Sequence, residues 1–143
     1  MRRFDEPIKA GIRYKHRPGV YGVLQRGDRI LLTFQSLPEP EFQLPGGGID
    51  PGETLQSALH REVREETGWS MAIRRRLGVF QRYTYMPEYD LWARKICHIY
   101  LCRPARSIEP PREADHSAHW FSQAEAMAIL ANGGDRFFVA SLF

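Results

Sequence analysis

The stretch from Pro45 to Gly68 constrains the fold of this chain more than any other part of the sequence. It opens with three consecutive glycines, Gly46–Gly48, and after Pro51-Gly52 it continues with 14 residues that include neither Gly nor Pro, Thr54 to Thr67. These residues are rich in helix formers, Thr54 is a suitable N-cap, and Gly68 is a suitable residue to end a helix. We therefore predict a flexible glycine-rich loop that leads into a helix over residues 54–67.

Three glutamates lie on the apolar stripe of this predicted helix. At about 100° per residue, one side of the helix is entirely polar. The other side carries two kinds of residue, namely Leu55, Ala58, Leu59 and Val63, together with Glu62, Glu65 and Glu66. Stripe residues normally face a protein core, and like charges three or four positions apart repel one another. Partial burial raises that cost, so something must offset the repulsion.

Two interpretations account for the three glutamates. In the first, they form a charged helix end near solvent, with salt bridges such as one between Arg61 and Glu65. In the second, they bind a divalent cation, because Mg²⁺ prefers carboxylate and carbonyl oxygens. Arg64 points away from Glu62 and Glu66 on the helical wheel, so basic neighbours do not neutralise the cluster. The pattern favours the metal site.

The glycine-rich loop indicates a phosphate ligand for such a metal. Its backbone can approach a phosphate closely or lend carbonyl oxygens to a cation. It is not a P-loop, because no Gly-Lys-Ser/Thr follows, and it lacks the spacing and strand context of a dinucleotide-binding fingerprint. A loop of this kind that runs into an acid-lined helix suggests a metal-bound pyrophosphate.

The rest of the chain predicts further strands and two more helices. Gly27-Asp28 has the chemistry of a tight hairpin turn, and Ser122 with Glu125 forms a capping box. The expected strands are 20–25, 29–34, 42–44, 71–76, 77–85, 91–102 and 116–121, and the expected helices run from Ser122 to about Ala131 and over 135–143. Strands around one well-formed helix, with another helix later, indicate an α/β (or α+β) sandwich.

Length and composition narrow the class of protein further. The 143 residues fit one domain, 1–143, with residues 1–17 as an N-terminal extension. The net charge of +3 is too small to indicate nucleic-acid binding by itself. No run of 18 apolar residues predicts a membrane span, and the charged N-terminal sequence lacks the apolar region of a secretory signal. We therefore expect a cytoplasmic protein.

The cysteines and histidines do not predict a zinc site or a disulfide. Cys97 and Cys102 fall in one predicted strand, which would separate their Cα atoms by roughly 16 Å. A disulfide needs Cα atoms within about 7 Å, so we expect free thiols in a reducing compartment. No Cys/His set has the spacing of a zinc site, and we expect structural or surface roles for His116 and His119.

The glycine-rich loop and the helix together resemble the Nudix box. That motif reads G-x5-E-x7-R-E-U-x-E-E-x-G-U, where U is bulky and apolar. All seven fixed positions agree within the 23 residues from Gly47 to Trp69, and they are Gly47, Glu53, Arg61, Glu62, Glu65, Glu66 and Gly68. Trp69 departs from the pattern, since the family more often has an aliphatic residue there. The resemblance implies a Nudix-type α/β/α sandwich with a mixed β-sheet over most of the chain.

The resemblance also implies roles for the matched residues. It implies that Mg²⁺ or Mn²⁺ is the cofactor, with four metal ligands: Glu62, Glu65, Glu66 and the carbonyl of Gly46. Glu53 and Arg61 would hold the loop to the helix, and a salt bridge from Arg61 would orient the acids. The implied catalytic residues are therefore Glu62, Glu53 and Arg61, with Glu62 as the first choice for the catalytic base.

Residues outside the box would choose the substrate. In this family the base can also be an acid from a later loop, for which Glu113 and Asp115 are candidates, and a solvated loop is the alternative for both. Tyr83 and Tyr85 could stack on a base, or they could pack on the sheet. Arg75, within the run Arg74-Arg75-Arg76, could reach distal phosphates, or it could belong to a solvated strand edge.

Three functions stay open under this resemblance. The first is a metal-dependent pyrophosphohydrolase that cleaves nucleoside diphosphates linked to another moiety, such as nucleoside triphosphates (including oxidised ones), dinucleoside polyphosphates or nucleotide sugars. The second acts on the 5′ triphosphate end of RNA, and the modest net charge argues against it. The third is a non-catalytic module that senses a ligand, and the three retained glutamates argue against it. We expect a small nucleotide-type substrate, no membrane partner, and a homodimer as in many relatives.

Overall fold

The computed structural model describes residues 1–142. Its strands are β1 (Arg2–Arg3), β2 (Lys15–Arg26), β3 (Arg29–Gln35), β4 (Glu41–Gln43), β5 (Gly46–Gly48), β6 (Trp69–Met86), β7 (Leu91–Ser107) and β8 (His116–Ser122). The helices are α1 (Leu55–Thr67), α2 (Gln123–Ile129) and α3 (Gly133–Ala140), and a single 3-10 turn, η1 (Pro87–Tyr89), connects β6 to β7. No helix in this part of the chain combines the length and the apolar character that a membrane crossing requires.

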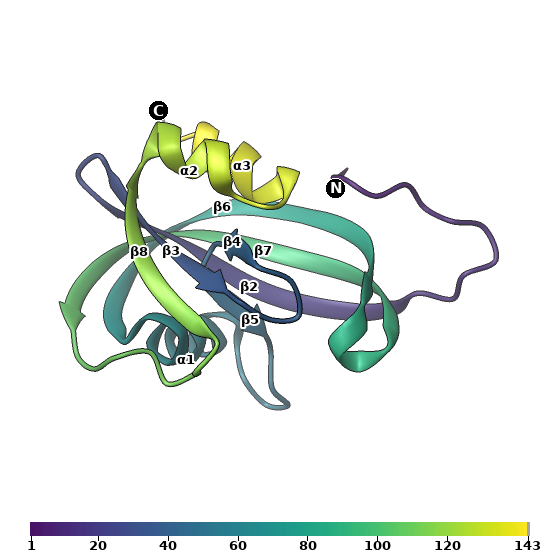
Figure 1. Ribbon diagram of the computed structural model, residues 1–143, viewed down its shortest axis with the longest axis horizontal. Coiled ribbons are helices and arrows are strands. Elements are labelled where there is room, and N and C mark those ends of the chain that lie inside the picture. The colour runs from purple at the N-terminus through teal and green to yellow at the C-terminus, as the bar shows by residue number, and fades with distance from the viewer. Residues whose placement is uncertain (143) are drawn as a thin grey trace.

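All eight strands belong to one mixed sheet (Figure 1). Their order is β1-β6-β7-β2-β3-β4, with β5 paired to β2 and β8 paired to β3. The pairs β1–β6 and β2–β7 are parallel, and the other pairs are antiparallel. The parallel pairing of β2 with β7 brings segments that are far apart in the sequence to the centre of the sheet.

Helices cover both faces of this sheet, as the α/β/α prediction requires. Successive residues of a strand point to opposite faces, and Val23 and Leu24 of β2 accordingly belong to different core clusters. Leu24 packs with Leu59 of α1 on one face. Val23 packs with Ala126 of α2 and Phe138 of α3 on the other face. The predicted fold class, an α/β sandwich with a mixed sheet, is confirmed.

Helix α1 begins and ends where the sequence predicts. The Thr54 hydroxyl accepts a hydrogen bond from the Ser57 N–H at 3.0 Å, and the Ser57 hydroxyl accepts one from the Thr54 N–H at 3.0 Å. This reciprocal cap satisfies two backbone donors at the N-terminus. Gly68 ends the helix in a left-handed conformation, with φ at 74°, which glycine adopts without steric cost.

The glycine-rich segment differs from its prediction as a flexible loop. Gly46–Gly48 form strand β5, which pairs antiparallel with β2. A Cβ atom on Gly46 would lie 2.2 Å from the carbonyl oxygen of Val20, and the φ of Gly46 is 151°. Gly46 therefore permits the close approach of two backbones, and the segment is a paired strand rather than a mobile loop.

Three other element predictions are corrected in detail. The strands expected over 71–76 and 77–85 are one strand, β6, whose pairing with β7 has three register irregularities: two place an extra residue in β6 and one places an extra residue in β7. The helix expected from Ser122 to about Ala131 ends at Ile129, because Leu130 forms a bridge with Phe42. The last helix, expected over 135–143, runs from Gly133 to Ala140 with Asn132 as its N-cap; residue 143 lies outside the described residues.

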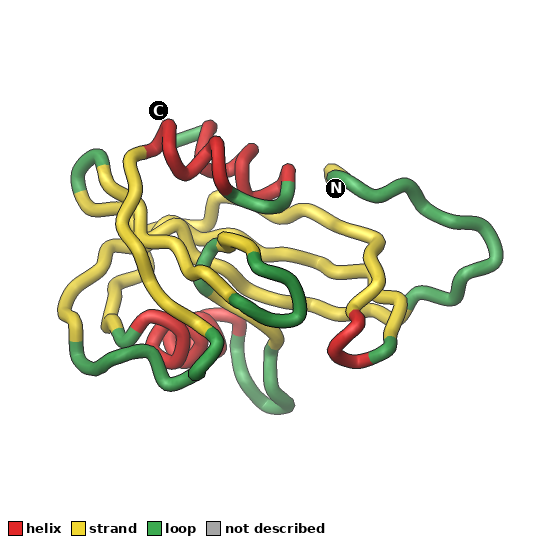
Figure 2. The backbone as a smooth tube through the Cα atoms, in the orientation of Figure 1, coloured by secondary structure: helices red, strands yellow, loops and turns green. Residues whose placement is uncertain are grey.

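The first 14 residues form an arm along the edge of the sheet (Figure 2). Its strand β1 pairs with β6, and the Phe4 ring lies edge-on against Phe80. The Asp5 carboxylate accepts a hydrogen bond from the Gly133 N–H at 3.1 Å. Glu6 pairs with Arg82 of β6 at 2.9 Å. These contacts attach the arm to β6 and to the start of α3.

Candidate functional site

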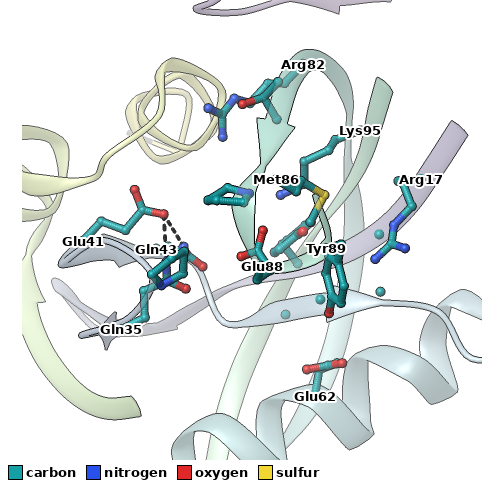
Figure 3. Close-up of a pocket in the computed structure, with 18 of the residues that line it drawn as sticks. Arg17, Gln35, Glu41, Gln43, Glu62, Arg82, Met86, Glu88, Tyr89 and Lys95 are labelled. Atoms are coloured by element: carbon teal, nitrogen blue, oxygen red, sulfur yellow. Dashed lines mark hydrogen bonds between the residues drawn. The ribbon is translucent and has the colours of Figure 1, made fainter. Parts of the chain in front are cut away.

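The C-terminal half of α1 and the glycine strand β5 meet at one pocket of about 400 Å³. This volume lies in the range of small-molecule sites. From the predicted site, Gly46, Glu62, Glu66, Tyr85 and Glu113 line the pocket. Figure 3 shows Glu62 on α1 below the pocket, with side chains from β2, β3, β4, β6 and β7 around it. The structure therefore brings two of the three helix acids and the later-loop acid to one cavity.

Glu66 is the most buried of the helix acids. Its side chain is 7% exposed, and its Oε1 accepts a hydrogen bond from the Gly46 N–H at 2.7 Å. Burial raises the pKa of Glu66 well above its ordinary value, and the neighbouring Glu62 adds to this effect. The hydrogen bond from Gly46 opposes the shift. A buried carboxylate of this kind needs a compensating charge, which a bound cation would supply.

Glu62 lies directly under the glycine strand. A Cβ atom on Gly47 would lie 2.8 Å from the Glu62 carboxyl carbon and from its Oε1. Only glycine at this position lets β5 and the carboxylate approach one another without displacement. Burial raises the pKa of Glu62, although the hydrogen bond from Arg61 opposes this.

Arg61 is the centre of the charge network beside the pocket. It pairs with Glu53 at 2.8 Å, with Glu62 at 3.0 Å and with Glu65 at 3.3 Å. The prediction that basic neighbours do not neutralise the acid cluster is therefore wrong for this residue, because its long side chain reaches across the helix from the polar side. Arg64 does point away, toward Glu109. The Arg61 hydrogen bond lowers the pKa of Glu53 to about 2, so Glu53 stays ionised.

The predicted box residues divide into two groups in space. Glu62, Glu66 and the glycines face the pocket. Glu53, Arg61 and Glu65 are not among its lining residues but connect to it through the Arg61 ion pairs. This arrangement separates the residues at the pocket wall from Glu53 and Arg61, which hold Glu62 and Glu65 in place.

The segment before β8 is attached to the end of α1. The Gly68 carbonyl accepts hydrogen bonds from the N–H groups of Ile108 at 2.8 Å and Glu109 at 3.2 Å, and the Glu65 carbonyl accepts one from the Arg112 N–H at 2.9 Å. A Cβ atom on Gly68 would lie 1.6 Å from the Glu109 carbonyl oxygen. We call residues 108–113 the strap. Because the strap lies so close to the end of α1, position 68 requires glycine.

The strap places Glu113 near the helix acids, and His116 lies between Glu113 and Glu66. His116 Nε2 lies 3.4 Å from Glu66 Oε2, and its Nδ1 lies 2.9 Å from Glu113 Oε2. One ligand atom from each of Glu66, Glu113 and His116 falls within 4.8 Å of the others, as in a site that could hold a metal ion. His116 is only 10% exposed, so it is not a surface residue. The sequence signal that could have identified it is its spacing from Glu113, which it follows by three residues.

Three predicted substrate contacts lie elsewhere. Tyr83 packs edge-on against Tyr14, with ring centroids 4.9 Å apart. Arg75 is an exposed residue of β6, and Asp115 pairs with His116 at 3.1 Å. None of the three lines the pocket. Tyr83 packs against Tyr14 of the N-terminal arm instead, and its neighbour Arg82 lines the pocket.

Other pocket residues escaped sequence reasoning because they come from separate strands. Arg17 of β2 lies over the ring of Tyr89 in η1, with 4.8 Å between the guanidinium carbon and the ring centroid. Lys95 of β7 and Glu41 of β4 also line the pocket. No local motif marks these positions, since only the order of strands in the sheet brings them together.

The donor set at the pocket suits a hard divalent cation. Glu62, Glu66 and Glu113 offer carboxylate oxygens at one wall, and oxygen ligands are those that Mg²⁺ and Mn²⁺ prefer. The glycine strand beside them leaves room that any side chain at Gly47 would fill. The residues present therefore fit a divalent metal.

Comparison with known proteins agrees with this geometry. The family model described as the NUDIX domain matches residues 15–142, and the chain belongs to this family. An RNA pyrophosphohydrolase from Erythrobacter litoralis is 40% identical over 82 residues, which cover 57% of this chain and 44% of that protein. A MutT-like protein from Streptomyces ambofaciens is 26% identical over 127 residues, which cover 89% of this chain and 77% of that protein. The chain therefore spans less than half of the first of these relatives.

Solved structures share the fold. A NUDIX hydrolase from Nitrosomonas europaea superposes with a TM-score of 0.73 at 22% sequence identity, over 88% of this chain and 87% of that chain. At this identity the likeness concerns the architecture. The sandwich and its mixed sheet are thus those of the family.

Proposed function

We propose that this protein is a divalent-metal-dependent pyrophosphohydrolase, which cleaves a phosphoanhydride bond in a nucleoside diphosphate linked to another group. The observation that carries the proposal is the placement of Glu62 and Glu66 against the glycine strand at one pocket. Membership of the NUDIX domain family supports it. So does the name of the RNA pyrophosphohydrolase relative, which also belongs to this reaction class.

The metal ligands in this proposal are Glu62, Glu65 and Glu66, with the Gly46 carbonyl as a further ligand. The structure adds Glu113 as a carboxylate at the same wall. Mg²⁺ or Mn²⁺, when bound, neutralises negative charge on the phosphate oxygens. Because the three helix acids repel one another, the same ion also offsets the cost of holding them together.

The chain itself positions the reacting groups. Glu62 accepts a proton at its carboxylate oxygen from the attacking water, whose oxygen forms the new bond to phosphorus as the bond to the leaving phosphate oxygen breaks. Glu113 is the alternative base, since it lies at the same pocket. Arg61 holds Glu62 in place through its pairing with Glu53. Most of the rate enhancement then comes from positioning and electrostatics.

The shape of the pocket favours a small nucleotide as the substrate. A cavity of about 400 Å³ accommodates one ligand of this size. RNA 5′ ends are the second candidate, and the named RNA pyrophosphohydrolase relative supports it.

The buried free thiols of Cys97 and Cys102 support a reducing compartment such as the cytoplasm.

Phosphate release from a panel of nucleotides tests the proposed function. The panel holds nucleoside triphosphates, 8-oxo-dGTP, diadenosine polyphosphates, ADP-ribose, NADH and a 5′-triphosphorylated RNA, each with Mg²⁺, with Mn²⁺ and with EDTA. Coupling to pyrophosphatase or phosphatase separates the products. We expect turnover of a small nucleotide with metal and none with EDTA. If only the RNA is hydrolysed, RNA 5′ ends replace small nucleotides as the proposed substrate. If no member of the panel is hydrolysed, the proposed enzymatic activity is wrong.

A further inference from the structure

Two amide side chains fix the carboxylate of Glu41 at the pocket wall (Figure 3). Gln43 Nε2 donates to Glu41 Oε1 at 2.5 Å, and Gln35 Nε2 donates to the same oxygen at 3.2 Å. All three residues are half-buried and line the pocket. Within residues 1–142, no hydrogen bond reaches Glu41 Oε2 and no cationic side chain pairs with this carboxylate. Oε2 of this oriented carboxylate is therefore free to accept hydrogen bonds from a ligand.

Lys95 brings a positive charge to the same pocket from another strand, β7. Its Nζ lies 5.8 Å from the centroid of the Tyr21 ring. In the described part of the chain it forms no ion pair with a carboxylate. The neighbouring Tyr21 raises the pKa of Lys95, so the ammonium is charged at neutral pH. An ammonium can only donate hydrogen bonds, so this wall offers donors where the Glu41 wall offers acceptors.

This division of donors and acceptors matches one nucleobase better than the others. Guanine has two adjacent donor groups, N1–H and N2–H₂, and next to them the acceptors O6 and N7. A carboxylate can accept from both donors, while a lysine donates to O6 or N7. Adenine and cytosine have a single donor group beside an acceptor, and uracil has one donor between two acceptors. None of these three bases presents a pair of donors to a carboxylate.

We propose that the walls formed by β3, β4 and β7 bind a guanine base, with Glu41 accepting from N1–H and N2–H₂ and Lys95 donating to its acceptor edge. The inference rests on the proposed function, because it assigns the substrate class of the same site. The substrates are then guanine nucleotides, of which GTP-type and 8-oxo-dGTP-type molecules share the N1, N2 and O6 edge.

The aromatic and the exposed acidic side chains of the pocket mouth do not discriminate between bases. Tyr89 is 60% exposed and Tyr85 is 39% exposed, and aromatic rings stack on any base. Glu39 and Glu88 also line the pocket, but both are exposed, and no amide donor holds either of them. The selectivity therefore depends on Glu41 and Lys95.

Equilibrium binding of nucleoside monophosphates tests the inference without turnover, because these ligands have no phosphoanhydride bond. Isothermal titration with Mg²⁺ present compares GMP, IMP, AMP and UMP. We expect GMP to bind at least about 10-fold more tightly than AMP or UMP, and IMP, which lacks the N2 amino group, to bind about 5-fold more weakly than GMP. Both dGMP and 8-oxo-dGMP should bind more tightly than dAMP. The ratio of their two affinities shows whether the site prefers the normal or the oxidised guanine base.

Matched variants locate the selectivity. Glu41→Gln keeps the Oε1 acceptor for both amides but places an NH₂ group at the Oε2 position. It should weaken GMP binding by about 10- to 100-fold and AMP binding much less. Glu39→Gln, which neutralises an exposed carboxylate of the same pocket, should leave the preference unchanged. Lys95→Met should weaken GMP binding as well, with the melting temperature reporting that the fold is intact.

The outcomes separate the inference from the proposed function. Equal affinities for GMP, IMP and AMP would overturn the guanine site, even if the protein hydrolyses nucleotides. An unchanged GMP preference in folded Glu41→Gln would overturn the role of this carboxylate. A clear GMP preference without hydrolysis of any nucleotide would support the guanine site and remove the proposed hydrolase activity.

Discussion

Arg61 donates to both carboxylate oxygens of Glu53, from Nε and from Nη2, with each N···O distance at 2.8 Å. The same guanidinium donates from Nη1 to Glu62 and Glu65, and from Nη2 to the carbonyl oxygen of Gly48. One planar group thus connects the glycine strand, the turn that follows it and the helix. Only arginine offers this many donors in a rigid fork.

Replacement of Arg61 by Lys should therefore reduce catalysis although it keeps the charge. A lysine has one nitrogen and cannot hold Glu53 and Glu62 at once. We expect kcat to fall at least about 10-fold and the free energy of unfolding to fall by about 1–2 kcal/mol. Steady-state kinetics and urea unfolding measure the two effects. Arg64→Lys, which alters only the contact with Glu109, should leave kcat nearly unchanged, and equal losses in both variants would contradict the role of Arg61.

Two neighbouring glycines provide a matched pair for the approach of Glu62 to β5. In Gly47→Ala, the new methyl group would lie 2.8 Å from the Glu62 carboxylate, whereas Gly48→Ala meets no atom within 4 Å. We expect the first substitution to lower kcat by about 10- to 100-fold, since small displacements of reacting groups are costly. The second should change kcat little. Steady-state kinetics and melting curves are measured for both variants. Equal kcat values in the two folded variants would show that Glu62 is not one of the reacting groups.

Glu66→Gln should separate the metal site from the fold. The glutamine can still accept the hydrogen bond from the Gly46 N–H, while the buried charge and its repulsion disappear. The metal-free variant should be as stable as the natural protein or more stable, by about 1 kcal/mol. Its turnover should fall by about 100-fold or more, and stabilisation of the fold by added Mg²⁺ should vanish.

The control for this variant is Glu109→Gln, in the strap but outside the pocket. It should retain both turnover and the Mg²⁺-dependent rise in melting temperature. If Glu66→Gln unfolds yet its folded fraction shows normal activity, the assignment of Glu66 as a metal ligand fails.

Asp135 should make the stability depend on pH. This side chain is buried at the start of α3, and burial raises its pKa from 3.8 to about 6, although a hydrogen bond from the Leu44 N–H opposes the shift. An acid whose pKa is higher in the folded state binds its proton more tightly there, so stability falls as pH rises. The loss is absent below about pH 4 and complete above about pH 6, and amounts to roughly 3 kcal/mol.

Asp135→Asn removes this ionisation. The variant should match the natural protein at pH 3.5 and exceed its stability at pH 7 by up to roughly 3 kcal/mol. Urea unfolding at a series of pH values gives the difference curve, with the exposed hairpin substitution Asp28→Asn as the control. A flat difference between pH 4 and pH 7 would show that Asp135 does not titrate in this range.

The elements that the sequence predicts well are those with local causes. Helix α1 has its start and end at Thr54 and Gly68 because the cap and the left-handed turn depend on residues within one helical turn. The periodicity of α1 also places Glu62 and Glu66 with the core-facing residues. These two features predict the part of the acid wall that α1 supplies, although the same periodicity also places Glu65 there, and Glu65 does not line the pocket.

The parts that escaped prediction depend on the order of strands. Glycine composition predicts mobility for Gly46–Gly48, but pairing with β2 makes them a strand. Lys95 and Glu41 share a pocket only because the sheet places their strands around it. Tyr83 and Arg75 were expected at the substrate on the basis of residue type, but Tyr83 packs against Tyr14 of the N-terminal arm and Arg75 is an exposed residue of β6. Sequence reasoning has no access to such long-range pairings.

The tight approach of the strap to Gly68 has a consequence for anyone who would transplant this site. Residues 47–69 carry the helix acids and Arg61, but Glu113 reaches the pocket only through a segment that is hydrogen-bonded to the C-terminal end of the helix. Transfer of residues 47–69 alone would therefore omit Glu113. Conversely, lengthening the strap by a residue would leave every letter of the motif unchanged and still move Glu113. Transfer of the site to another protein therefore requires both the helix and the strap.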